Sequence, residues 1–354
     1  MHCEAILSDA AQLFPTSALT GNYLFLGKSG TPIGGTLNSD APGAFTLTAT
    51  QDATHVFVHL AGALAAGAGV PAAAANTTIE LDLYAGDVIE LLGQPSSAAE
   101  VPHADLSGSI LNADKPIQVL SSVPITAVPS PAPPSDCCGD HLEEALPPAE
   151  ALGTKYLVLP PSTAKGSAFG HYVRLIGMQP TSLTYENAPS GAPAQLQTGQ
   201  VVEFEAKAAF SVAGTAAFGV VSLLEAGTLQ NGCANDPSCY VGDPSMSFIV
   251  PNEQFLSRYA FATSGEFPTN YADVVAPMGT TVTLDGSALA ATPESVVNGW
   301  VAYRVNLGAA AGLHTLAATQ PFGVQLLGFA YATSYYAPGG QSAKLLGEPP
   351  VVTH

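Results

Sequence analysis

The chain has 354 residues, which is too long for one ordinary β-sandwich core and suits two or three domains of about 100 to 150 residues each. Apolar residues make up 47% of it and charged residues 10%, and its 35 Gly and 29 Pro follow no collagen-like period. This composition is typical of short strands joined by many turns. Nine Lys and Arg against 28 Asp and Glu give a formal net charge of −19, which excludes nucleic acid and anionic lipid surfaces as favoured partners. A protein or a neutral glycan fits the charge better.

The strand pattern appears at several places along the chain. Residues 79–83 alternate apolar and acidic, and 281–285 alternate in the same way with threonines. In 201–205, Val202 and Phe204 are expected to face a core while Glu203 and Glu205 face water. Only 140–152 has a helical character, and Pro147-Pro148 breaks it. The sequence therefore predicts an all-β fold.

Comparing the order of the strands shows three copies of one pattern. Each copy opens with a tyrosine strand, at 23–26, 156–159 and 259–262. A stretch with a central turn follows and reads as a hairpin, at 45–60, 171–185 and 271–284. Each copy ends with a buried strand, at 114–120, 217–221 and 320–326. Copies one and two share a segment at 85–90 and 198–203, where copy three has the different residues 303–307.

These copies predict three tandem β-sandwich-like modules. We expect them at 1–134, 135–245 and 246–354, with a short disordered tail at the end. The first boundary follows the Pro-rich connection 123–134, and the second lies at the loop 227–244, which holds two cysteines.

The N-terminus and the cysteines indicate an exported protein. The start Met1-His2-Cys3-Glu4 has no signal-peptide character, so we expect the leader to be absent from this sequence, and no apolar run is long enough to span a membrane. Cys233 and Cys239 close a short loop and predict a disulfide. One of the adjacent Cys137 and Cys138 is expected to pair with a distant cysteine, for which Cys3 is the candidate. Alternatively, Cys3 is a lipoprotein anchor. Either reading places the chain outside the cell or on its surface.

Nothing in the chain carries a recognisable catalytic motif, so we expect no enzyme and no catalytic residue. The cluster 136–144 combines thiols, carboxylates and His141, but we interpret it as a disulfide-anchored loop in which Asp140 and Glu143 cap a helix, and we predict no metal site there. His55 and His59 lie about 13 Å apart on one strand, too far to share a metal. Gly27-Lys28-Ser29 ends a strand and lacks the spacing of a phosphate loop.

We expect no cofactor. Calcium is the ion that an exported acidic β-protein could hold, and the turns at Asn235-Asp236, Gly242-Asp243 and Asp285-Gly286 offer oxygen ligands. Asx-turns explain the same residues.

Several segments resemble, in order, the N-terminal domain of IgG-Fc-binding proteins, and they cover about residues 20 to 340. They are 113–117, 138–148, 153–156, 183–185, 196–205, 282–286, 312–315 and 322–335. Abundant Ala and few Lys and Arg suggest a bacterial-type member. The resemblance implies binding and not catalysis, and it assigns no binding residue.

The sequence thus predicts an exported, non-catalytic binding or adhesion module that recognises a protein or glycan partner. The alternative is a structural subunit that associates with itself into a filament or coat. If the partner is a glycan, Tyr335, Tyr336 and the single tryptophan, Trp300, are the candidate binding aromatics.

Overall fold

The structure is a computed structural model that describes residues 9–30, 42–96, 102–130, 139–232, 240–297 and 299–350. All five cysteines lie outside these residues, and so does Asn235-Asp236. The predicted disulfides and that calcium turn are therefore outside the described part of the chain.

Strands dominate the described residues and form three units, each with two antiparallel layers. The first unit contains β1 (Asn22–Leu24), β2 (Ala44–Ala49), β3 (Thr54–His59), β4 (Thr78–Leu83), β5 (Val88–Leu92), β6 (Ile110–Ala113), β7 (Ile117–Thr126) and β8 (Asp140–Ala145). The second contains β9 (Lys155–Val158), β10 (His171–Gly177), β11 (Thr181–Glu186), β12 (Gln195–Leu196), β13 (Val201–Ala206), β14 (Phe210–Gly214), β15 (Phe218–Leu224) and β16 (Ser245–Phe248). The third contains β17 (Leu256–Thr263), β18 (Thr269–Pro277), β19 (Val282–Leu284), β20 (Ser287–Ala288), β21 (Glu294–Ser295), β22 (Trp300–Gly308), β23 (Gly312–Ala330) and β24 (Thr333–Pro338).

The same pairing order recurs in each unit. The first has the sheets β1-β6-β3-β4 and β5-β2-β7-β8, and the second has β9-β14-β11-β12 and β13-β10-β15-β16. In the third, β23 is long enough to serve both layers, which gives β17-β23-β19-β20 and β22-β18-β23-β24. The predicted all-β fold with tandem β-rich units is confirmed, while the exact boundaries after residues 134 and 245 stay predictions.

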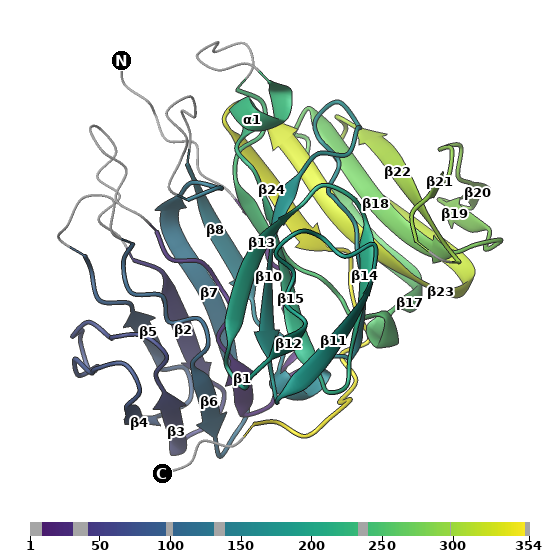
Figure 1. Ribbon diagram of the computed structural model, residues 1–354. Coiled ribbons are helices and arrows are strands. Elements are labelled where there is room, and N and C mark those ends of the chain that lie inside the picture. The colour runs from purple at the N-terminus through teal and green to yellow at the C-terminus, as the bar shows by residue number, and fades with distance from the viewer. Residues whose placement is uncertain are drawn as a thin grey trace.

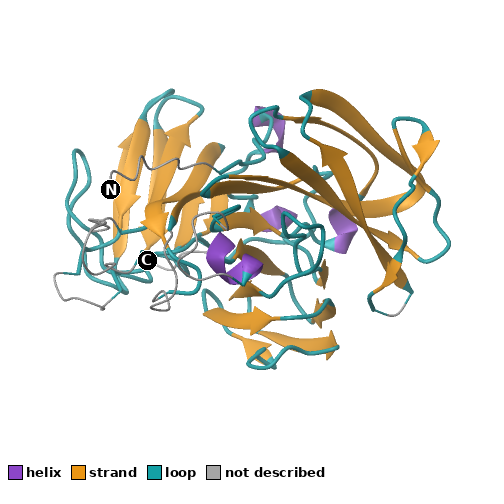
Figure 2. Ribbon diagram, turned by 90° about the horizontal axis from the view of Figure 1, so that it is seen from above, coloured by secondary structure: helices purple, strands orange, loops and turns teal. Residues whose placement is uncertain are grey.

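Figure 1 shows the first unit in purple and blue, the second in teal and the third in green to yellow. Seen from above in Figure 2, the units do not follow one another in a straight line but surround a common centre. Among the described residues, no helix is long and apolar enough to cross a membrane.

The three predicted hairpins are wrong, and all three for the same reason. The turns lead from β2 to β3, from β10 to β11 and from β18 to β19, but each pair of strands belongs to two different layers. The chain therefore crosses the core at each turn. Consecutive strands face each other through apolar side chains such as Leu47 and Val56, which are 0% and 1% exposed, and not through backbone hydrogen bonds.

The predicted helix-capping role of Asp140 and Glu143 is also wrong. Residues 140–145 form β8, which pairs with β7 in the register Ser122↔Glu143. These residues form a strand and not a helix because the alternate side chains Leu142 and Glu144 are buried against neighbouring elements. Only the short 3-10 turn η2 (Ala149–Ala151) follows.

The opening tyrosine of each unit has the same structural role. The hydroxyl of Tyr23 donates to the carbonyl oxygen of Ile117 at 2.6 Å, and the hydroxyl of Tyr156 donates to that of Phe218 at 2.5 Å. Tyr259 donates in the same way to Phe322. Each bond ties the first strand of a unit to its closing strand, at the start of β7 and of β15 and in the middle of β23.

A short 3-10 turn precedes each of these tyrosines. The turns are η1 (Thr16–Ala18), η2 and η4 (Asn252–Gln254), and their N-caps are Pro15, Pro148 and Pro251. A proline fixes its own φ near the value these turns need, so it suits this position. The only α-helix in the described residues, α1 (Gly227–Asn231), ends at Gly232 with φ +69°.

Candidate functional site

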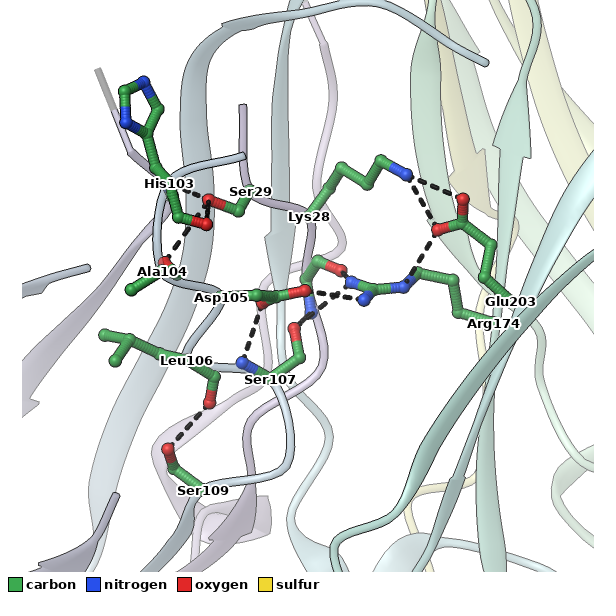
Figure 3. Close-up of polar contacts among 12 residues, drawn as sticks. Lys28, Ser29, His103, Ala104, Asp105, Leu106, Ser107, Ser109, Arg174 and Glu203 are labelled. Carbon is green, nitrogen blue, oxygen red and sulfur yellow. Dashed lines mark hydrogen bonds and ion pairs between the residues drawn. The ribbon is translucent and has the colours of Figure 1, made fainter. Parts of the chain in front are cut away.

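The first and second units meet at a buried network of ions (Figure 3). Arg174, on β10, is 7% exposed, and its Nη2 lies 2.6 Å from Oδ2 of Asp105 in the loop before β6. Its Nε lies 3.1 Å from Oε2 of Glu203 on β13, and Nζ of Lys28 lies 2.7 Å from the same oxygen. Arg174 Nη1 also donates to Oγ of Ser107 at 3.2 Å. The two cations and two carboxylates balance one another.

Electrostatics within the network favour the charged forms of Asp105 and Arg174. Burial would raise the pKa of Asp105, but Arg174 and Ser107 hold it below its usual range. Burial would lower the pKa of Arg174, and the two carboxylates raise it instead. Burial lowers the pKa of Lys28, and Glu203 offsets part of this effect. Because the two cations and two carboxylates pair with one another across the contact, the network joins the first unit to the second.

A second network joins the second and third units. Nη1 of Arg304, on β22, lies 3.1 Å from Oδ2 of Asp273 on β18 and donates to Oγ of Ser162 at 3.1 Å. Its Nη2 donates to the carbonyl oxygen of Pro160 at 2.9 Å. The Ser162 N–H donates to Asp273 at 2.7 Å. Burial raises the pKa of Asp273, and Arg304 opposes that rise.

The two networks occupy the same place in their units with the charges exchanged. Arg174 lies opposite Glu203 on neighbouring strands, and Asp273 lies opposite Arg304 in the corresponding register. In the first unit the corresponding positions are Thr46 and Glu90, which also face each other across two strands. Glu90 is exposed there.

A partly buried carboxylate marks the centre that the units share. Asp9 Oδ2 accepts hydrogen bonds from the N–H groups of Glu143 on β8, at 3.1 Å, and of Met246 on β16, at 3.2 Å. Asp9 Oδ1 accepts one from Tyr336 on β24 at 3.5 Å. The three donors occupy equivalent positions in their units. They lie opposite Ser122, Leu223 and Leu327 on the closing strands, and each of these residues follows the tyrosine's carbonyl acceptor on the same strand by the same number of residues.

Two carboxyl groups at this centre have perturbed pKa values. Burial raises the pKa of Asp9 well above its usual value, and the backbone N–H donors oppose that rise. Glu144 is 1% exposed, and burial together with the nearby Asp9 raises its pKa well above normal as well.

The candidate binding aromatics do not form one surface. Tyr336 is 1% exposed and packs inside the third unit's contact with the second, so its assignment to a binding surface is wrong: its ring is covered by the neighbouring strands. Tyr335 is partly buried, donates to Asn270 at 2.9 Å and meets the ring of Phe267 at 4.8 Å. Trp300 is partly buried against Phe255 at 6.0 Å. Among the described residues, the exposed aromatics are Tyr84, at 65%, and Tyr331, at 57%.

The histidines lie in unrelated places. His55 is exposed, and its Nδ1 lies 2.5 Å from Oδ1 of Asp82 on the next strand. His59 lies 3.3 Å from the hydroxyl of Thr78. His171 is fully buried with its Nδ1 2.6 Å from Oγ of Ser222, and burial lowers its pKa to about 3. A neutral, enclosed imidazole of this kind serves packing and hydrogen bonding.

Among the described residues, no group of three or more His, Cys, Asp and Glu side chains is placed to hold a metal ion. Of the predicted calcium turns, Asp285 accepts from the Thr315 N–H at 2.7 Å and pairs with His314 at 2.9 Å. Calcium binding stays a prediction.

Sequence reasoning missed both ion networks. The signal was the scarcity of arginine, because Arg174, Arg258 and Arg304 are the only three in the chain and two of them are buried partners of carboxylates. Charged side chains are seldom buried unless paired, so a rare arginine within an apolar strand indicates such a pair. The role of Asp9 could not be inferred from the sequence, because its hydrogen-bond donors are backbone groups of distant strands.

Comparison with known proteins agrees with the resemblance noted in the sequence. The family model described as IgGFc binding protein matches residues 9–328. The human IgGFc-binding protein is 31% identical over 284 residues, which are 79% of this chain and 5% of that protein. This chain thus spans a small part of the length of its human relative, and no solved structure matches it. The chain belongs to the IgGFc-binding protein family.

Proposed function

We propose that this chain is an exported, non-catalytic binding or adhesion module that recognises a protein partner at the cell surface or in the extracellular matrix. The observation that carries the proposal is the family match, which spans residues 9–328 and includes a human relative named for binding IgG Fc. A neutral glycan is the other partner class that fits the charge of −19.

The arrangement of the units supports this role. Binding surfaces gain affinity when the groups that form them are already held in place, because less motion is lost on binding. Here two buried ion networks and Asp9 hold the three units against one another. Loops on each unit are therefore presented in fixed relative positions, as a multi-point contact with a protein requires.

The test is a binding panel with the oxidised chain on a sensor surface. The analytes are antibody Fc, mucin and a set of neutral glycans, each at low and high salt, and the Fab fragment of the same antibody is the matched control for Fc. A saturable signal for one protein analyte, with a dissociation rate that high salt leaves nearly unchanged, supports the proposal and names the partner class. Signals for glycans alone would replace the protein partner by a glycan, and a silent panel would contradict the binding role.

One observation favours the alternative, a subunit that associates with itself. Val201, on β13 of the second unit, is partly buried against the apolar cluster that the first and second units share, but the corresponding Val88 of the first unit is 60% exposed. A second copy of the chain could cover this face. Sedimentation velocity over a range of concentrations tests it: self-association that Val88→Glu abolishes, while the exposed control Leu313→Glu does not, would support a filament or coat.

A further inference from the structure

The third unit departs from the other two at the connection before its outer strand. In the first unit, residues 84–87 make a tight turn, and Gly86 N–H donates to Ala49 O at 2.9 Å. In the second unit, residues 197–200 do the same, and Gly199 N–H donates to Gly177 O at 2.8 Å. The third unit has the longer segment 289–299 in this place, part of which folds back as β21. This is where the sequence pattern of copy three also differs.

The longer segment leaves a pocket at the open side of the third sandwich. Its volume is about 380 Å³, which is within the range of ligand pockets. The turn between β18 and β19, the strand β20, the segment before β21 and the start of β22 line it. The lining residues are Met278, Gly279, Thr280, Thr281, Val282, Ala288, Leu289, Pro293, Val301 and Tyr303.

The lining indicates the chemistry of the ligand. None of these residues carries a charge, and Val282 and Thr280 are 2% and 4% exposed, whereas Met278, at the rim, is 59% exposed. Within the described residues, the Thr280 hydroxyl has no hydrogen-bond partner. A buried hydroxyl left unpaired costs free energy, so a ligand that brings it a polar atom gains from the contact. The pocket therefore suits an apolar group next to a hydrogen-bonding atom, which is what a side chain and its peptide backbone provide.

The surroundings indicate how the ligand is carried. The charged residues between 278 and 303 are Asp285 and Glu294, both acidic, in a chain of net charge −19. Asp285 lies 2.9 Å from His314 and Glu294 lies 3.6 Å from Arg304, but their side chains are still 47% and 53% exposed, so both carboxylates can also face a cation of a partner. The two strands beside the pocket, β20 and β21, are the outermost strands of the third unit's sheet order, and each has two residues. Such edges leave backbone groups available to an extended chain.

We propose that this pocket binds an aromatic or branched aliphatic side chain that is carried on an extended, basic segment of a partner protein. This proposal adds a binding site to the proposed function. It depends on that function in one respect, that the partner is a protein. The apolar side chain fills the space between β19, β20 and β22, and flanking Lys or Arg residues face Asp285 and Glu294.

The test uses the chain labelled with ¹³C at its methionine methyl groups. The chain has four methionines, of which Met278 lies at the pocket rim, while Met178 and Met246 are 2% and 1% exposed elsewhere and serve as internal controls. The probes are acetylated Gly-Lys-X-Lys-Gly amides with leucine, tryptophan or alanine at X. We expect the leucine and tryptophan peptides to shift the Met278 signal alone, with an affinity about tenfold above the alanine peptide.

Two variants fill the pocket from opposite walls, Ala288→Phe and Pro293→Phe, and both should abolish the shift. The matched control is Ser287→Phe, one residue along β20, where the side chain points to the other face of the strand. Unchanged Met178 and Met246 signals show that a variant is folded. Equal shifts with leucine and alanine, no shift at Met278, or an effect of Ser287→Phe equal to that of Ala288→Phe would overturn the proposal. Since the peptides report on the pocket alone, this result is independent of the binding panel.

Discussion

Arg174 is the residue whose loss should most weaken the contact between the first and second units. The substitution Arg174→Met keeps a long side chain in the strand but removes the charge. It leaves Asp105 without its cation, and Glu203 with Lys28 alone. Breaking a buried ion pair costs about 3 to 5 kcal/mol. Because the Asp105 side chain is 33% exposed and water can reach it, we expect the lower end, about 3 kcal/mol in the free energy of unfolding.

The assay is urea unfolding followed by far-UV circular dichroism, and the chain supplies its own control. Arg258 is exposed on β17, so Arg258→Met should change the free energy of unfolding by less than about 0.5 kcal/mol. Adding Asp105→Asn to Arg174→Met removes the unpaired carboxylate and should restore about 1 kcal/mol or more. A loss under about 1 kcal/mol for Arg174→Met would refute the reasoning, because that is what a surface ion pair contributes.

Three further predictions follow from the other buried polar groups. Arg304→Met should destabilise the chain by about 3 kcal/mol, since Asp273 would remain buried and unpaired, and the same urea assay measures it. Tyr156→Phe removes the hydroxyl that joins two strands of the second unit and should cost about 1 kcal/mol or more in that assay. Asp9 and Glu144 have folded-state pKa values above their usual 3.8 and 4.5, so they favour folding while protonated, and their contribution is lost as pH rises above these values. The free energy of unfolding should therefore be measured from about pH 4 to pH 7 for the parent chain and for the double variant Asp9→Asn, Glu144→Gln. It should fall less steeply with pH in the double variant, and an unchanged slope would contradict the raised pKa values of Asp9 and Glu144.

The strands were predictable from the sequence because their alternation is a local property. Val202 and Phe204 face the core as expected, although Glu203, on the other face, meets Arg174 and not bulk water. What alternation could not tell is which strand a given strand pairs with. A two-layer sandwich and a hairpin give the same pattern of apolar residues, because both bury one face of each strand.

The recurrence of tyrosine strands was visible in the sequence, but its cause was not. Pro15, Pro148 and Pro251 each precede the tyrosine of their unit by the same number of residues, a spacing that the comparison of strand order passed over. Proline followed by a short turn and then tyrosine marks the entry to each unit. The carbonyl acceptors of the tyrosines lie far along the chain, so only the structure could identify them.

The distribution of basic residues has a consequence for the choice of partner. Of the nine Lys and Arg, Lys28, Arg174 and Arg304 are buried between units and already paired with carboxylates. Cationic groups available at the surface are therefore fewer than the composition suggests, and the surface charge is dominated by carboxylates. A surface of one sign attracts partners of the opposite sign over the range of the Debye length, about 8 Å at physiological salt, and accelerates their encounter. Salt should then slow the association of a basic partner while leaving its apolar anchor, and hence its rate of dissociation, nearly unchanged.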